Sequence, residues 1–114
     1  MGRYCLVEGR FVEAQVGEEL HIQQFPNTFA VVRSDGVPVC IPHDGCTVEF
    51  LTVVPGLDKH RVLRHLQPGQ TAHYQILSSG KRERDVVTLK TGAIVDLKDL
   101  MGCCTFQITE EQHP

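Results

Sequence analysis

The fold is decided by a stretch that reads Gly69-Gln70-Thr71-Ala72-His73-Tyr74-Gln75-Ile76-Leu77. Apolar and polar residues alternate along it with a period of two, which is typical of a β-strand that buries one face. The same alternation is present in residues 19–23, 46–53 and 103–108. Turn-forming residues separate these segments at short intervals. We therefore predict an all-β protein whose strands direct their apolar side chains to one shared core.

Residue types that tolerate particular backbone angles place several of the turns. Asp35-Gly36 is typical of a two-residue type I′ hairpin. Pro68-Gly69 suits a type II turn, because proline presets φ and glycine accepts a positive φ. Pro38 and Pro42 lack a backbone N–H donor, so the segment around Cys40 is predicted to be an edge strand or irregular.

Two short segments are compatible with helix. Residues 58–66 fit either a helix capped by Asp58 or a strand. We favour the strand, because it suits the internal repeat described next. Residues 97–101 fit a single helical turn before Gly102.

The sequence of residues 4–54 is similar to that of residues 57–109. Glycine, histidine and glutamine coincide in the first matching segment, and the apolar positions stay in phase. Chance matches between β-strands are the alternative explanation, since glycine, valine and alternation recur in any β-protein. We predict an internal duplication whose halves share one interior: a small barrel or sandwich of about 8–10 short antiparallel strands with pseudo-two-fold symmetry. The matching segments are 17–25 with 69–77, 31–41 with 86–97, and 45–50 with 102–108.

Length and composition indicate a single domain, residues 1–114. A chain of 114 residues buries enough surface for a core without metal or disulfide cross-links, and its 41% hydrophobic content is ordinary for a globular protein. No apolar run approaches the ~20 residues of a membrane-spanning helix, so no membrane partner is expected. The five cysteines include an adjacent pair and are odd in number. They make a poor disulfide framework, which favours a cytoplasmic location.

A cluster of cysteine and histidine is the first candidate site. Cys40, His43 and Cys46 follow at intervals of three and could supply three zinc ligands, with Cys103 or its neighbour Cys104 in the matching loop as the fourth. The alternative is purely structural, because cysteine packs well in cores as a small apolar residue. We favour the structural role, so no cofactor is expected, with zinc as the alternative.

Two histidines form the second candidate. His21 and His73 occupy matching positions of the repeat and lie on the polar side of their strands. They would contact a ligand only if that side lines a cleft. The alternative is a pair of solvent-exposed histidines on the sheet surface.

A basic strip is the third candidate. Between residues 59 and 84 there are six basic residues and one acid, although the whole chain carries a net charge of −3. Such a strip suits a phosphate backbone or an acidic protein surface. Oligonucleotide-binding barrels also use aromatic stacking platforms, and only Tyr74 is aromatic in this window. We interpret it first as a solvated face or a partner interface. The strip comprises Lys59, Arg61, Arg64, Lys81, Arg82 and Arg84.

Motifs of common enzyme classes are missing from the sequence. There is no Gly-x-Ser-x-Gly elbow and no phosphate-binding glycine-rich loop between a strand and a helix. We therefore predict a non-enzymatic binding or interaction module, with a homo-oligomer or another protein as its partner. The alternatives are an oligonucleotide-binding barrel that uses the basic strip, and a metal-binding protein or enzyme centred on Cys40, His43 and Cys46.

Overall fold

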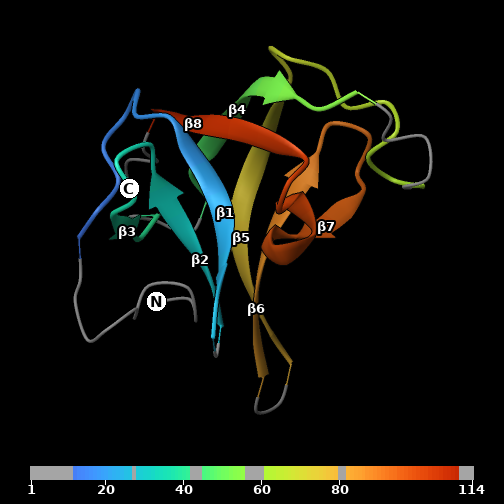
Figure 1. Ribbon diagram of the computed structural model, residues 1–114. Helices are drawn as coiled ribbons and strands as arrows, with labels where there is room; N and C mark the ends of the chain where they lie inside the picture. Colours follow the sequence, from blue (N-terminus) through green and yellow to red (C-terminus); the bar gives the residue numbers. More distant parts are fainter. Residues whose placement is uncertain (1–11, 27, 42–44, 56–60, 80–81, 111–114) are drawn as a thin grey trace.

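The computed structural model describes residues 12–26, 28–41, 45–55, 61–79 and 82–110. Within them lie eight strands and one short 3-10 helix (Figure 1). No helix of this part of the chain has the length and hydropathy needed to cross a bilayer. The elements are β1 (Leu20–Phe25), β2 (Thr28–Arg33), β3 (Pro38–Val39), β4 (Thr47–Val53), β5 (Thr71–Ser79), β6 (Arg82–Leu89), β7 (Ile94–Asp96), η3 (Leu97–Leu100) and β8 (Cys104–Glu110).

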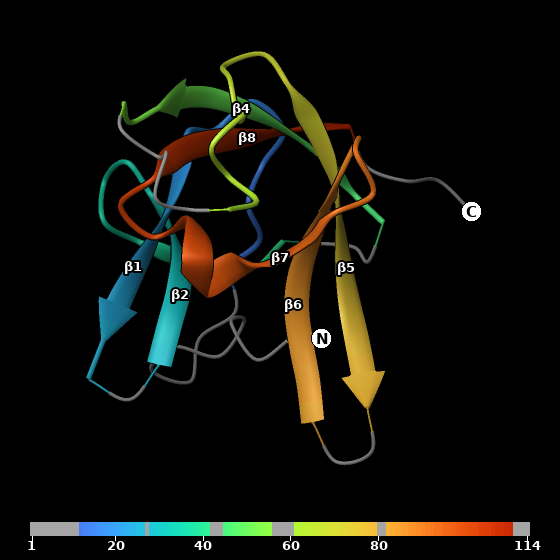
Figure 2. The ribbon, with the colours of Figure 1, turned by 90° about the vertical axis from the view of Figure 1, so that its right-hand side faces the viewer.

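All eight strands belong to one antiparallel sheet with the order β3-β2-β1-β8-β4-β5-β6-β7. Strands β3 and β7 are its two ends, so the sheet is open and is not a closed barrel. It folds over on itself. In Figures 1 and 2 the β4–β8 pair lies at the top, and the β1–β2 and β5–β6 hairpins extend downward from it as two separate arms of the sheet. The protein is therefore an all-β, sandwich-like fold, as the alternation of the sequence predicts.

The concave side of the folded sheet holds the core. Two alternate residues in each of the four inner strands form the centre of the core, and each of these eight residues is at most 3% exposed. The apolar phase expected from the sequence is confirmed, and Ile76 of the same phase is half-buried. The core residues of these strands are Leu20 and Ile22 of β1, Val48 and Phe50 of β4, Ala72 and Tyr74 of β5, and Phe106 and Ile108 of β8.

The strand order is a palindrome when the first four strands are exchanged with the last four. Strand β1 pairs with β8, and β5 pairs with β4, so each half places its final strand beside the other half. At the centre, Phe50 pairs with Phe106, and Glu49 pairs with Gln107. The turns that lead into β1 and β5 also make equivalent hydrogen bonds to the central strands. Gly17 N donates to the Ile108 carbonyl at 3.0 Å, and Gly69 N donates to the Phe50 carbonyl at 2.8 Å.

The β2–β3 and β6–β7 hairpins have the same turn. Arg33 N donates to the Val37 carbonyl at 2.9 Å, and Leu89 N donates to the Ala93 carbonyl at 2.8 Å. Three residues therefore lie in each loop, so the two-residue type I′ prediction at Asp35-Gly36 is wrong in length. A glycine with φ near 90° closes each loop, Gly36 in one and Gly92 in the other. This is the type I turn followed by a left-handed residue that three-residue hairpins favour.

The segment before β5 is not the strand that we favoured. Residues 61–65 form consecutive turns, and Leu66 N donates to the Leu63 carbonyl at 2.9 Å. Leu63 and Leu66 are both buried in the core. A spacing of three brings both onto one side of a turn, whereas a strand would direct them to opposite faces. The helical turn expected near residues 97–101 is present as η3.

The segment around Cys40 lies at an edge of the sheet, as the two prolines predict. Pro38 begins β3, the end strand, and Pro42 lies outside the described residues. Part of this edge is covered from the N-terminal side. Cys40 N donates to the Val12 carbonyl at 2.7 Å, and Ala14 N donates to the Cys40 carbonyl at 2.9 Å.

Candidate functional site

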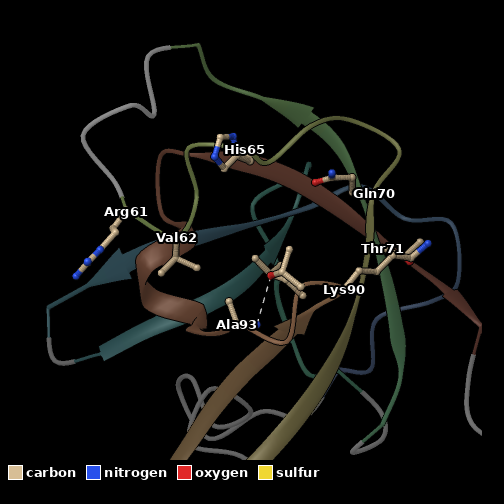
Figure 3. Close-up of a pocket in the computed structure, with 9 residues that line it drawn as sticks. Arg61, Val62, His65, Gln70, Thr71, Lys90 and Ala93 are labelled. Atoms are coloured by element: carbon tan, nitrogen blue, oxygen red, sulfur yellow. Dashed lines mark hydrogen bonds between the residues drawn. The ribbon is translucent and has the colours of Figure 1, made fainter.

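A pocket of about 390 Å³ opens beside the β6–β7 hairpin (Figure 3). Its volume lies near the lower end of the range of small-ligand sites. Three separate segments form it: the turns at residues 61–65, the start of β5, and the hairpin turn from the end of β6 to Ala93. The lining residues are Arg61, Val62, His65, Gln70, Thr71, Leu89, Lys90, Thr91 and Ala93.

The charged groups of the pocket are all basic. Arg61, His65 and Lys90 are exposed side chains at its rim, and none of the nine lining residues is acidic. In Figure 3, Arg61 and Lys90 lie on opposite sides with their charged ends directed outward. Long side chains of this kind can rotate toward a bound group. The rim therefore presents a positive potential to an approaching ligand.

The interior of the pocket is apolar with a few hydrogen-bonding groups. Val62, Leu89 and Ala93 supply aliphatic surface, and Thr71 and Thr91 supply hydroxyls. This combination of an apolar wall with a small number of polar groups is typical of ligand sites.

Local hydrogen bonds fix three of the polar lining residues. Gln70 Oε1 accepts from Gln67 N at 3.0 Å, and Thr91 Oγ1 accepts from Ala93 N at 3.4 Å (Figure 3). His65 Nε2 accepts from Arg64 Nε at 3.2 Å. The permanently charged side chains of the rim are those of Arg61 and Lys90.

The corresponding place at the β2–β3 hairpin carries an ion-pair group. Arg33 Nη2 lies 2.8 Å from Asp35 Oδ2, and Arg33 Nε lies 3.7 Å from Glu18 Oε2. The hydrogen bond from Arg33 lowers the pKa of the Asp35 carboxyl, so this carboxyl is ionised at neutral pH. Here the chain supplies both the cation and its two acidic partners.

The predicted histidine pair does not converge. His21 lies on β1 and His73 on β5, and strands β8 and β4 separate them in the sheet. Three strand spacings amount to about 14 Å. His73 Nδ1 lies 3.4 Å from Thr47 Oγ1 on the outer face of the sheet. A joint ligand site for His21 and His73 therefore draws no support from this arrangement.

The predicted basic strip is divided among several places. Arg61 lines the pocket, and Arg64 lies in the same turns. Arg84 is five residues from the pocket end of β6, or about 16 Å along the strand, and its guanidinium donates to Asp96 Oδ1 at 2.6 Å. The backbone of Arg82 begins β6. Lys59 and Lys81 lie outside the described residues.

The four described cysteines are not joined by a disulfide. Cys40 and Cys46 are buried, and Cys103 is half-buried, with its thiol 3.4 Å from the Asp99 carbonyl. His43, the central member of the proposed zinc set, lies outside the described residues. Among the residues that are described, no group of three His, Cys, Asp or Glu side chains could hold a metal ion.

One buried acid escaped the sequence analysis. Asp85 is 3% exposed, and its Oδ2 accepts a hydrogen bond of 2.7 Å from the Tyr74 hydroxyl. Asp85 directly follows Arg84, the last residue of the basic strip that was interpreted as a solvated face, and the sequence contains no signal of its burial. The pair lies in the core and away from the residues that line the pocket.

Most pocket residues were also missed, because they come from segments separated by up to 32 positions, from Arg61 to Ala93. Arg61 was the one lining residue among the candidates. A signal was nevertheless present in the alignment of the two halves. Charged residues of the first half correspond to uncharged residues of the second: Glu18 to Gln70 and Asp35 to Thr91 in the alignment, and Arg33 to Leu89 through the strand register.

In comparisons with known proteins, no family model matches the chain, and neither the curated proteins nor the solved structures contain a significant match.

Proposed function

We propose that this chain is a non-enzymatic binding module that takes an anionic ligand in the pocket beside the β6–β7 hairpin. The observation that carries the proposal is the charge of the lining, in which Arg61 and Lys90 flank an apolar interior and no described lining residue is acidic. Such a site attracts anions and rejects cations.

Titration with simple organic and inorganic anions tests the proposal. Isothermal calorimetry with phenyl phosphate, benzoate and inorganic phosphate is expected to detect binding of at least one of them. Two anions of similar shape but different charge, such as phenyl phosphate and benzoate, also show how strongly the rim responds to charge.

Variants then assign the binding to the pocket. Arg61→Ala and Lys90→Ala should each weaken binding by about tenfold, which corresponds to the loss of one charge-assisted hydrogen bond. Lys98→Ala is the matched control, because Lys98 is an exposed lysine on η3 that does not line the pocket. No detectable binding of any of the three anions, or equal losses in all three variants, would overturn the proposal.

Oligonucleotide binding is the alternative that the basic strip suggests, and it draws less support. Arg84 is engaged by Asp96, and about 16 Å of β6 separates it from the pocket. Fluorescence anisotropy with a labelled single-stranded oligonucleotide distinguishes the two functions. Binding that exceeds the affinity for all small anions and depends on Arg84 would favour this alternative.

We also propose that the two halves are copies of one unit, supported by the palindromic strand order and by matching turns. A cytoplasmic location is likewise our proposal and is consistent with the thiol state of the four described cysteines. Self-association remains part of the proposed binding role. Its candidate surfaces are the short end strands β3 and β7.

A further inference from the structure

We infer that the ligand of this pocket is an amphipathic anion, with an apolar body held by Leu89, Val62 and Ala93 and an acidic group held at the rim by Arg61 and Lys90. We also infer that the uncharged residues Gln70, Leu89 and Thr91 keep this hairpin end accessible to the ligand. Both inferences rest on the proposed function, and they specify the chemistry of its ligand.

The first step is the equivalence of the two hairpin ends. The turn preceding β1 has a 3.2 Å bond from Glu18 N to the Gln15 carbonyl, and the turn preceding β5 has a 3.2 Å bond from Gln70 N to the Gln67 carbonyl. The side chains repeat the pattern as well. Glu18 Oε1 accepts from Gln15 N at 2.6 Å, and Gln70 Oε1 accepts from Gln67 N at 3.0 Å.

The same equivalence holds on the neighbouring strand. Leu20 pairs with Arg33 across β1 and β2, and Ala72 pairs with Leu89 across β5 and β6. Asp35 and Thr91, which follow in the two hairpin loops, also make equivalent hydrogen bonds. Asp35 Oδ1 accepts from Val37 N at 3.0 Å, and Thr91 Oγ1 accepts from Ala93 N at 3.4 Å. Glu18, Arg33 and Asp35 thus occupy the places of Gln70, Leu89 and Thr91.

The two sets differ in charge. In the first half, the Arg33 guanidinium extends between Glu18 and Asp35, and its own partners satisfy it. In the second half, a leucine replaces the arginine, and an amide and a hydroxyl replace the two acids. The hairpin end therefore loses its internal ion pairs and gains an apolar wall. The charges that remain nearby, Arg61 and Lys90, have no acidic partner among the lining residues.

The position of the charges defines the orientation of the ligand. The cations stand at the rim with outward-directed ends (Figure 3), whereas Val62, Leu89 and Ala93 line the space between them. A fully hydrated inorganic ion would meet the cations without using the apolar wall. A ligand that joins an apolar body to an acidic group uses both, because burial of its body adds the hydrophobic contribution.

A ligand series on the unmodified chain tests the chemical class. Phenyl phosphate should bind about tenfold or more tightly than inorganic phosphate, because only the former buries a ring. Phenol, which has the ring without the anionic group, should also bind about tenfold or more weakly than phenyl phosphate. Equal affinities for phenyl phosphate and inorganic phosphate would contradict this inference and leave the proposed anion site standing. Absence of binding by every anion would remove both.

A transplant of the first-half residues tests the role of the three positions. The triple variant Gln70→Glu, Leu89→Arg, Thr91→Asp should rebuild the ion-pair group and lower the affinity for phenyl phosphate at least twentyfold. The double variant Gln70→Glu, Thr91→Asp separates the two causes, since it adds acids without the arginine that fills the space. Circular dichroism checks the fold, and the same triad is already accommodated at the first hairpin.

Retention of phenyl phosphate affinity in a folded triple variant would contradict the role of these positions. Should the triple variant not fold, the double variant Gln70→Glu, Thr91→Asp provides the comparison, because the two acids alone oppose an anionic ligand at the hairpin end. Phenyl phosphate affinity that these two acids leave unchanged would equally refute it.

Discussion

Gln107 Nε2 donates a 2.9 Å hydrogen bond to Glu49 Oε1 at the centre of the β4–β8 pair. These two residues are partners in the strand register, and the proposed duplication places them at equivalent positions of its two halves. The bond therefore lies where the halves meet. Because both side chains are partly buried, it contributes to the stability of the whole sheet.

A double-mutant cycle measures this contribution. Glu49→Ala and Gln107→Ala should each lower the free energy of unfolding, and the double variant should lose less than the sum. The expected coupling is about 1 kcal/mol, the usual net value of such a bond. Urea denaturation of the four proteins provides the measurement, and strictly additive losses would show that the bond contributes nothing.

The buried hydroxyl of Tyr74 should contribute more to the free energy of unfolding than the exposed hydroxyl of Thr88. Tyr74→Phe removes a donor from the buried Asp85 carboxyl and should lower the unfolding free energy by about 1–3 kcal/mol. Thr88→Val is the matched control on the same hairpin, since it removes an exposed hydrogen bond to Gln75. Thermal denaturation of both variants reports the difference. Equal losses would show that the buried bond between Tyr74 and Asp85 contributes no more to stability than the exposed one.

The two hairpin glycines should respond alike to substitution. Gly36→Ala and Gly92→Ala each introduce a side chain at φ near 90° with no atom close enough to clash. The cost is therefore conformational, about 1–2 kcal/mol in each case. Ser34→Ala in the first loop is the control. A neutral result for either glycine in chemical denaturation would show that its turn is adaptable.

Alkaline pH should destabilise the protein partly through Cys104. Burial, with the neighbouring Cys103 as a smaller cause, raises the pKa of this thiol to about 12 from an ordinary value of 9.0. The unfolded chain thus releases the proton at a lower pH than the folded chain. This contribution to stability is complete below pH 9 and is lost as the pH rises toward 12.

The measurement compares the wild type with Cys104→Ala in urea titrations from pH 8 to pH 10. The wild type should lose about 1 kcal/mol more than the variant across this interval. Other alkaline groups are common to both proteins, so the difference in slope isolates Cys104. Parallel curves would show that the thiol is not protected by burial.

The strands and their buried faces were predictable because burial in a sheet has a period of two. Ile22, Tyr74 and Phe106 are buried as their sequence phase indicates. Turn positions were also predictable from glycine and proline. The loop length at Asp35 was not, since Asp-Gly is compatible with both two-residue and three-residue hairpins.

Features that depend on contacts between distant segments were not predictable. The last strand of each half pairs with the first strand of the other half, β8 with β1 and β4 with β5. Local sequence patterns do not specify which strands are neighbours, so this pairing could not be predicted. The segment at residues 61–65 has apolar residues that fit a strand or a turn, and only the position of the core decides that Leu63 and Leu66 share one side. The pocket depends on that segment, which explains why Lys90 was not identified as a rim residue.

The most direct test of the account is a titration of isotope-labelled protein with phenyl phosphate, followed by two-dimensional NMR of the backbone amides. We predict that saturable chemical-shift changes concentrate at Thr71, Leu89 and Lys90, and that the corresponding residues of the first half, Glu19, Arg33 and Ser34, do not shift. Changes spread evenly over both hairpins, or no saturable change at all, would contradict the assignment of this pocket as the binding site.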